Sequence, residues 1–174
     1  MTPLLPGLAQ VGQDEVMPHA STPGPRPREQ RIADTLAMLT SPARDAWVAS
    51  SSDDGAAQPY LIPLSLAWLQ ERVVLALPES SRTARNIAGI SSTRLALGHT
   101  RDVVLVDAVL EQTVPMVDAP PALAQGYAAQ ADWDPREDPD GYVYLVLHPQ
   151  QIQAWREVDE LRGRTLMRDG AWVS

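Results

Sequence analysis

The sequence predicts a mainly β protein, an antiparallel β-barrel with helices in its connections. Short apolar or alternating stretches recur between turn residues, in a pattern typical of about seven short strands and three helices. Successive stretches are joined by short polar turns, which favours hairpins over parallel strands. The chain has no internal repeat and no GxGxxG loop, which argues against a doubly wound nucleotide-binding sheet.

The chain divides into a tail and one folded domain. Residues 1–27 are rich in proline and glycine and show no apolar period, so we expect a disordered tail. The remaining residues, 28–174, form one domain, because a chain of 174 residues that is 44% hydrophobic is long enough for one real core and short for two.

The elements of this domain follow from periodicity. Ile32, Leu36 and Leu39 recur at helical spacing from Arg28 until Ser41-Pro42 ends the run, which predicts an amphipathic helix. Pro120-Pro121 opens a small helix, expected over 122–131. Strands are expected at 46–51, 58–69, 72–77, 94–98, 103–113 and 142–147, and extended segments at 152–155, 165–168 and 171–173.

A third helix begins near Ser81, where Ser80 or Ser81 can cap its first turn. Arg82, Arg85 and Asn86 fall at i, i+3 and i+4, which predicts one cationic face, while Ala84, Ile87 and Ala88 are expected to pack. Free amides at a helix N-terminus and two guanidinium forks favour an anion, above all a phosphate. The alternative from these residues alone is a surface helix with solvated arginines.

The composition and charge of the chain argue against several classes of binding partner. A net charge of −8 argues against nucleic acid, since no long basic footprint is available. The chain has no cysteine, and its three histidines are scattered without ligand spacing, so we expect no metal site. No window resembles a membrane span or a signal peptide, so we expect a cytoplasmic protein without a membrane partner.

Three segments together resemble the pyridoxamine 5'-phosphate oxidase-like family of flavin-binding split β-barrels. They are the hairpin 47–64, the segment Ser81-Arg82-Thr83-Ala84-Arg85-Asn86-Ile87, and Arg94-Leu95-Ala96-Leu97-Gly98. The resemblance covers about residues 28–173 and implies a split β-barrel.

The resemblance also implies where a cofactor binds. The strand similar to residues 61–65 lies along the flavin in this family, which points to Ile62, Pro63, Leu64 and Ser65. The family's phosphate-binding segment corresponds to Ser81, Arg82, Thr83, Arg85 and Asn86. Many members have lysine where this chain has Thr83, so Arg85 has to supply the second cation.

A late segment resembles the family's tryptophan followed by arginines. It contains Trp155, Arg162 and Arg164, which the resemblance places at the shared site, with either arginine in the anion-binding position. The alternative for Trp155 is a packing residue of the barrel or of an interface.

The resemblance implies a flavin-dependent oxidoreductase that binds FMN at the interface of a homodimer and transfers hydride to or from a small organic substrate. In this family the ring carries the redox chemistry, which agrees with a sequence that offers no catalytic triad or carboxylate dyad, and the catalytic residues stay unassigned. Strands 60–69 and 103–111 are apolar on both faces, as strands covered by a second chain are. The alternatives are a reductase that uses the deazaflavin coenzyme, a non-catalytic flavin-binding protein, and a haem-binding relative.

Overall fold

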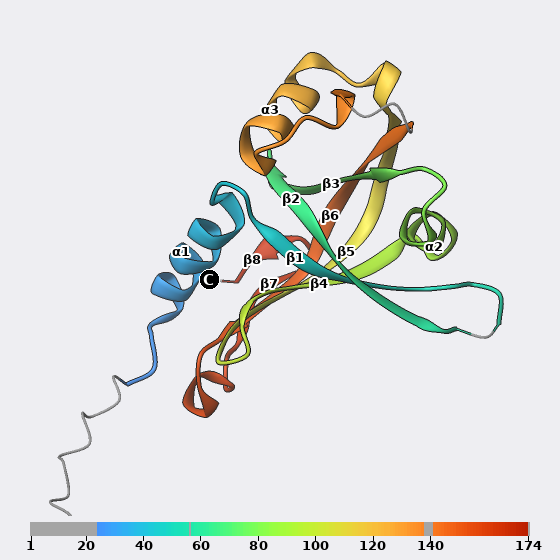
Figure 1. The fold of residues 1–174 in the computed structure, drawn as a ribbon. Helices are drawn as coiled ribbons and strands as arrows, with labels where there is room; N and C mark the ends of the chain where they lie inside the picture. The colour runs from blue at the N-terminus through green and yellow to red at the C-terminus, as the bar shows by residue number, and fades with distance from the viewer. Residues whose placement is uncertain (1–23, 56, 138–140, 174) are drawn as a thin grey trace, which may run out of the picture.

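The structure is a computed structural model that describes residues 24–55, 57–137 and 141–173. Its centre is an antiparallel β-barrel (Figure 1). The strands that build the sheet are β1 (Asp45–Ser51), β2 (Pro59–Leu69), β3 (Arg72–Pro78), β4 (Ser92–His99), β5 (Asp102–Pro115), β6 (Tyr142–Trp155), β7 (Thr165–Arg168) and β8 (Ala171–Trp172). Their order is β3-β2-β1-β4-β5-β6-β7-β8, and an added pairing of β3 with β6 closes the first six strands into a ring. The predicted barrel is confirmed.

The barrel is split between β2 and β3. Residues 66–69 of β2 pair with β3, whereas residues 59–65 pair only with β1. On its other edge β3 pairs with β6 from Val73 to Pro78, so residues 76–78 of β3 have no partner in β2. The first half of β2 therefore diverges from the second half of β3, and a cleft opens between them.

Three helices lie in the connections (Figure 1). Helix α1 (Arg28–Thr40) places Leu39 in the main core, and α2 (Arg82–Ile90) packs beside β1. Helix α3 (Pro121–Ala131) covers the outer face of β2 and β3 through a second core that includes Tyr127 and Tyr144. Short 3-10 turns lie at Met116–Asp118, Pro135–Glu137 and Val158–Glu160.

One strand is longer than the sequence predicts. We expected separate segments at 142–147 and 152–155, because proline rarely continues a strand, but β6 runs unbroken from Tyr142 to Trp155. Pro149 lies opposite Ala108, next to a shift in the β5–β6 register. A bulge at this point accommodates a residue that has no N–H to donate.

The tail prediction is tested only at its end. Residues 1–23 lie outside the described residues. The last four residues of the segment that we expected to be disordered are described, and Arg26 is bound to the barrel, as set out below. The ordered domain therefore begins before Arg28.

Candidate cofactor-binding site

The cleft between β2 and β3 holds a cavity of about 320 Å³. Three of the predicted cofactor residues, Pro63, Leu64 and Ser65, line one side, and residues 76–78 of β3 line the other. Asp45, Trp133 and Tyr142 complete the lining. Ile62 is half-buried in the preceding part of β2. The cleft joins an apolar wall to a few polar atoms, as small-molecule sites do.

Aromatic side chains brace this cleft from the side of α3. The rings of Trp133 and Tyr142 meet edge to face at 5.5 Å between centroids, and Tyr127 packs on Trp133 at 6.0 Å. The Tyr127 hydroxyl donates a hydrogen bond to the Ser65 carbonyl at 3.2 Å, and burial raises the pKa of Tyr127. Sequence reasoning missed Trp133 and Tyr142, because no local pattern reveals that these two residues reach the cleft.

Helix α2 begins where the sequence predicts, directly after Ser81. The Ser81 side chain caps the helix by accepting a hydrogen bond from the Ala84 amide at 3.2 Å. The guanidinium of Arg82 lies 4.6 Å from the centre of the Tyr60 ring, and Arg85 donates to the Ser80 carbonyl. Neither arginine forms an ion pair with a carboxylate of the described chain.

The helix terminus adjoins the cleft through two connections. The Ser81 amide donates to the carbonyl of Pro78, which itself lines the cleft, at 2.9 Å. Tyr60, which contacts Arg82, precedes Pro63 by three residues on β2. Two exposed cations therefore stand on a helix that follows one strand of the cleft and contacts the other strand.

Two predicted phosphate ligands lie on the other side of the helix. Thr83 and Asn86 are buried, and the Asn86 amide donates to the Ser50 hydroxyl of β1 at 3.1 Å. We expected Asn86 on the cationic face and Ala88 on the packing face, but Asn86 is buried and Ala88 is exposed. The reason is that α2 packs a polar pair against β1, so spacing alone did not decide which side faces the barrel.

The late residues lie elsewhere in the chain. Trp155 ends β6, and the Arg164 guanidinium lies 5.7 Å from its ring centre. Arg164 also lines a separate hollow of about 310 Å³ together with Arg28 and Arg168, and Arg162 is exposed. In Figure 1 this loop is at the lower left, whereas α2 is at the right. A single chain does not bring these residues to the cleft.

The outer face of β1, β4 and β5 carries a second hollow, of about 580 Å³. An ion pair between Arg94 and Asp107 crosses it, with an Nη2–Oδ2 distance of 2.9 Å. Exposed apolar side chains flank this surface: Trp47 is 51% exposed and Leu61 57%, and they belong to neighbouring strands. Apolar residues this exposed on a sheet indicate a surface that another molecule can cover.

Among residues 24–55, 57–137 and 141–173, no group of three or more His, Asp or Glu side chains could hold a metal ion. No helix in this described part of the chain is long and apolar enough to cross a membrane.

Comparison with known proteins agrees with the fold. No protein-family model and no curated protein matches the sequence. Solved structures do match. A heme binding protein from Mycobacterium smegmatis superposes with a TM-score of 0.59 at 19% identity, over 83% of this chain and 59% of its own. An F420 reductase superposes with a TM-score of 0.55 at 17% identity, over 67% of this chain and 94% of its own. A proposed pyridoxamine 5'-phosphate oxidase from Listeria innocua superposes with a TM-score of 0.52 at 9% identity, over 75% of this chain and 98% of its own.

These similarities establish the fold. The chain has the architecture of the pyridoxamine 5'-phosphate oxidase-like split β-barrels, as the resemblance of the sequence implied. Proteins with this architecture include reductases and heme-binding proteins, so the fold alone does not fix the cofactor.

Proposed function

We propose that this chain binds FMN or the deazaflavin coenzyme, with the phosphate at the N-terminus of α2 and the ring in the cleft between β2 and β3. We further propose that it is an oxidoreductase that transfers hydride to or from a small organic substrate. One observation carries the proposal: two arginines without carboxylate partners in the described chain stand next to a cleft lined by predicted cofactor residues. Fold similarity to a reductase is consistent with it.

The residues present fit a phosphate group. The first amides of a helix have no acceptor within the helix, and the helix dipole favours negative charge at this end. Arg82 and Arg85 are exposed, and their described contacts are a ring face and a backbone carbonyl. A phosphate can replace both contacts with charge-assisted hydrogen bonds, which are stronger.

The cleft also fits an aromatic ring system. Its lining combines apolar surface from β2 and β3 with Trp133 and Tyr142. A bound flavin or deazaflavin supplies the redox chemistry, and the residues of the chain bind and orient it. Ser65 is held in place by the Tyr127 hydrogen bond to its carbonyl, which fixes the wall along which the ring would lie.

A homodimer is part of the proposal. A cavity of about 320 Å³ is at the lower end of the range for small-molecule sites, so a whole cofactor needs a further wall. Trp47 and Leu61 are exposed apolar residues on either side of Pro63: Trp47 lies opposite Pro63 in the β1–β2 pairing, and Leu61 precedes Pro63 by two residues on β2. A second copy seated there would cover this surface and supply Trp155 and Arg162 or Arg164, which do not line the cleft of their own chain. Light scattering that shows only monomers at micromolar concentration rejects the shared site.

The test is a titration of the purified protein with FMN, riboflavin and the deazaflavin coenzyme. Replacing Arg82 or Arg85 by alanine removes a charge-assisted bond of about 1.5 to 3 kcal/mol, which is about a 10-fold to 100-fold loss of FMN affinity. Riboflavin lacks the phosphate, so its affinity should stay unchanged in the same variants. Arg72→Ala is the control, because Arg72 pairs with Glu111 away from the cleft. Variants that bind FMN as tightly as the wild type reject the phosphate site.

Haem is the second candidate, favoured by the structural similarity to a heme binding protein. Haem iron needs an axial ligand, and the lining of the cleft offers Tyr142 but no histidine or methionine. The absorption spectrum of the protein decides between the candidates. A Soret band supports haem, a flavin spectrum supports FMN, and fluorescence gained with the deazaflavin supports that coenzyme.

A further inference from the structure

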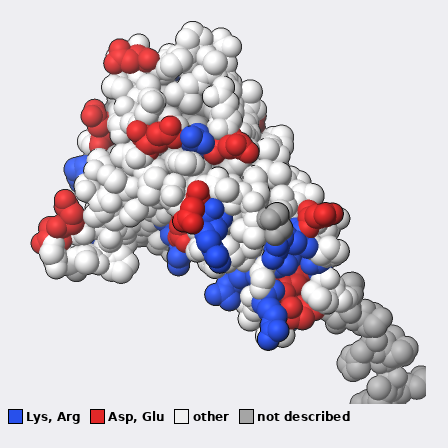
Figure 2. Space-filling view, turned by 180° about the vertical axis from the view of Figure 1, so that it is seen from behind, with Lys and Arg blue, Asp and Glu red and all other residues white. Residues whose placement is uncertain are grey.

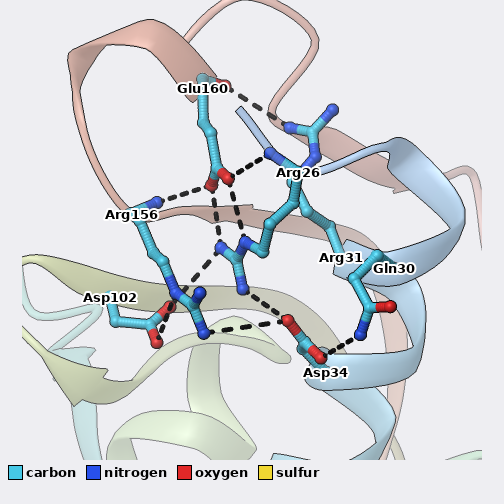
Figure 3. Close-up of polar contacts among 7 residues, drawn as sticks. All are labelled: Arg26, Gln30, Arg31, Asp34, Asp102, Arg156 and Glu160. Carbon is cyan, nitrogen blue, oxygen red and sulfur yellow. Dashed lines mark hydrogen bonds and ion pairs between the residues drawn. The ribbon is translucent and has the colours of Figure 1, made fainter. Parts of the chain in front are cut away.

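A buried carboxylate anchors the loop that carries the late arginines. We call residues 156–164 the C-terminal arm. Glu160 is the buried residue of this arm, with 3% of its surface exposed, whereas Val158 is 79% exposed. The Glu160 carboxylate accepts hydrogen bonds from the Arg26 amide at 2.9 Å, from Arg26 Nε at 2.9 Å and Nη2 at 2.8 Å, and from the Arg156 amide at 2.7 Å (Figure 3).

Arg26 connects this carboxylate to two other parts of the fold. Its Nη1 atom donates to Asp34 of α1 at 2.7 Å, and its Nη2 atom lies 3.5 Å from Asp102, at the start of β5. Arg156 donates to the same Asp102 at 3.1 Å. Figure 3 shows the Arg26 guanidinium between the three carboxylates. One residue from the N-terminal segment therefore joins α1, the β4–β5 turn and the arm.

Between its ends, the arm has few other attachments to the barrel among the described residues. Three of its backbone bonds are local, from Glu160 N to Glu157, Leu161 N to Val158 and Arg164 N to Leu161, whereas at the end of the arm the Arg164 carbonyl accepts a hydrogen bond from the Ala154 amide of β6 at 2.9 Å. The Arg31 guanidinium reaches the Glu160 carbonyl only at 3.4 Å. The ion pair of Arg101 with Glu157 is largely exposed, with 79% and 41% of the two side chains accessible, and exposed pairs of this kind contribute little.

A buried carboxylate without its cation is unfavourable, because desolvation is no longer offset by pairing. If Arg26 is removed, the Glu160 carboxylate is most stable when it rotates out of the fold and is hydrated. The exposed turn that carries it can move with it, because local opening of such a turn costs little free energy. The position of the whole arm then changes. Trp155, which precedes the arm at the end of β6, and Arg164, the last residue of the arm, then lose the geometry in which the guanidinium lies over the ring.

We propose that Arg26 is a positioning residue that holds the C-terminal arm in place through Glu160, and so sets where Arg162 and Arg164 are presented. The part that concerns the cofactor rests on the proposed function, because it requires these arginines to reach the cleft of a second copy. The part that concerns the arm does not depend on it.

Amide hydrogen exchange of the full chain tests the arm directly. Arg26→Gln should exchange at least about 10-fold faster in peptides that cover 156–164, with α2 and β2 unchanged. Arg26→Lys keeps the charge but loses the two-atom fork, and should give an intermediate rate. The matched control is Arg101→Gln, which breaks the exposed pair beside the same loop and should change nothing. Unchanged exchange of the arm in Arg26→Gln overturns the proposal.

A double variant separates positioning from general loss of stability. In Arg26→Gln with Glu160→Gln no charge is left buried, so the arm should return toward the exchange rate of the wild type even though the ion pair is missing. A purely structural role predicts that the double variant is at least as mobile as Arg26→Gln. If Arg26→Gln does not fold, Arg26→Lys and the double variant provide the same comparison.

FMN titration of the same proteins tests the consequence for the site. Where the wild type binds FMN, a folded Arg26→Gln should bind it about 10-fold more weakly, and Arg26→Lys should recover part of the loss. Equal affinity with a mobile arm overturns the role at the cofactor. If the wild type binds neither FMN nor the deazaflavin, the proposed function fails and the role at the cofactor with it, while the exchange data still decide whether Arg26 holds the arm.

Discussion

Arginines at two ends of this barrel differ in what surrounds them. At the N-terminus of α2, Arg82 contacts a tyrosine ring and Arg85 a backbone carbonyl. At the other region, Arg26 is surrounded by Asp34, Asp102 and Glu160. The chain has more acidic than basic residues and a net charge of −8, so carboxylates are not scarce. No carboxylate of the described chain pairs with Arg82 or Arg85, which leaves two guanidinium groups for an external anion, whereas the carboxylates around Arg26 are used within the fold.

Figure 2 shows blue and red side chains intermingled beside the start of the described chain, the region that includes the Arg26 cluster. Arginine content alone therefore says little about binding. What distinguishes a binding arginine from a structural one is whether a buried carboxylate already occupies its fork.

The largest expected effect is on stability. Arg26→Gln leaves Glu160 buried without its cation, and breaking a buried pair costs about 3 kcal/mol or more. Arg82→Ala removes an exposed side chain and should cost no more than about 0.5 kcal/mol. Urea unfolding of both variants measures the two values. Equal losses would show that the two regions do not differ in the way described.

The pH dependence of stability sharpens the same comparison. The hydrogen bonds from Arg26 lower the pKa of Glu160 to about 2, from an ordinary value of 4.5. The folded state thus favours the charged carboxylate, and its contribution is complete above about pH 5.5, falls as the pH drops below 4.5 and is gone below about 2. The difference in unfolding free energy between wild type and Glu160→Gln should shrink by up to about 3 kcal/mol over this window. A difference that stays constant from pH 6 to 2.5 contradicts the assignment.

Sequence reasoning reached local features and missed the distant ones. The Ser81 cap was predictable, because it depends only on residues next to it in the chain. The position of the cap also predicts that Arg82 is the first residue of the helix. The Arg26–Glu160 pair spans 134 positions, and no local pattern signals it.

The same limit applies to the candidate site. Pro63, Leu64 and Ser65 were placed through the resemblance of the hairpin, and the structure puts them in the cleft. Trp133 and Tyr142 join them only because α3 packs on β2 and β3, and this tertiary packing is not visible in any local sequence pattern. Asn86 was assigned to the wrong helix face, since a buried amide can pair with Ser50 as readily as it can face solvent.

A third prediction converts one region into the other. Tyr60→Asp places a carboxylate next to Arg82, so the α2 terminus acquires the kind of internal partner that Arg26 has. A phosphate then competes with that carboxylate, and FMN affinity should fall by about 10-fold to 100-fold, the range of one charge-assisted bond. Tyr60→Phe keeps the ring face and should bind FMN as the wild type does. Isothermal titration measures both, and an Asp variant with unaltered affinity argues against a phosphate at Arg82.

The smallest expected effect comes from shortening the N-terminus, and its contrast with a slightly longer deletion defines where the fold begins. Arg26 makes its contacts through both its amide and its side chain, and Pro27 accepts a hydrogen bond from the Arg31 amide at 3.1 Å. Removing residues 1–23 retains all of these bonds and should change unfolding free energy by no more than about 0.5 kcal/mol. Removing residues 1–27 deletes Arg26 and should cost about as much as Arg26→Gln, about 3 kcal/mol. Urea unfolding of the two truncated chains gives both values. If they are equally stable, the Arg26 cluster contributes nothing and the domain begins at Arg28, as the sequence pattern alone indicates.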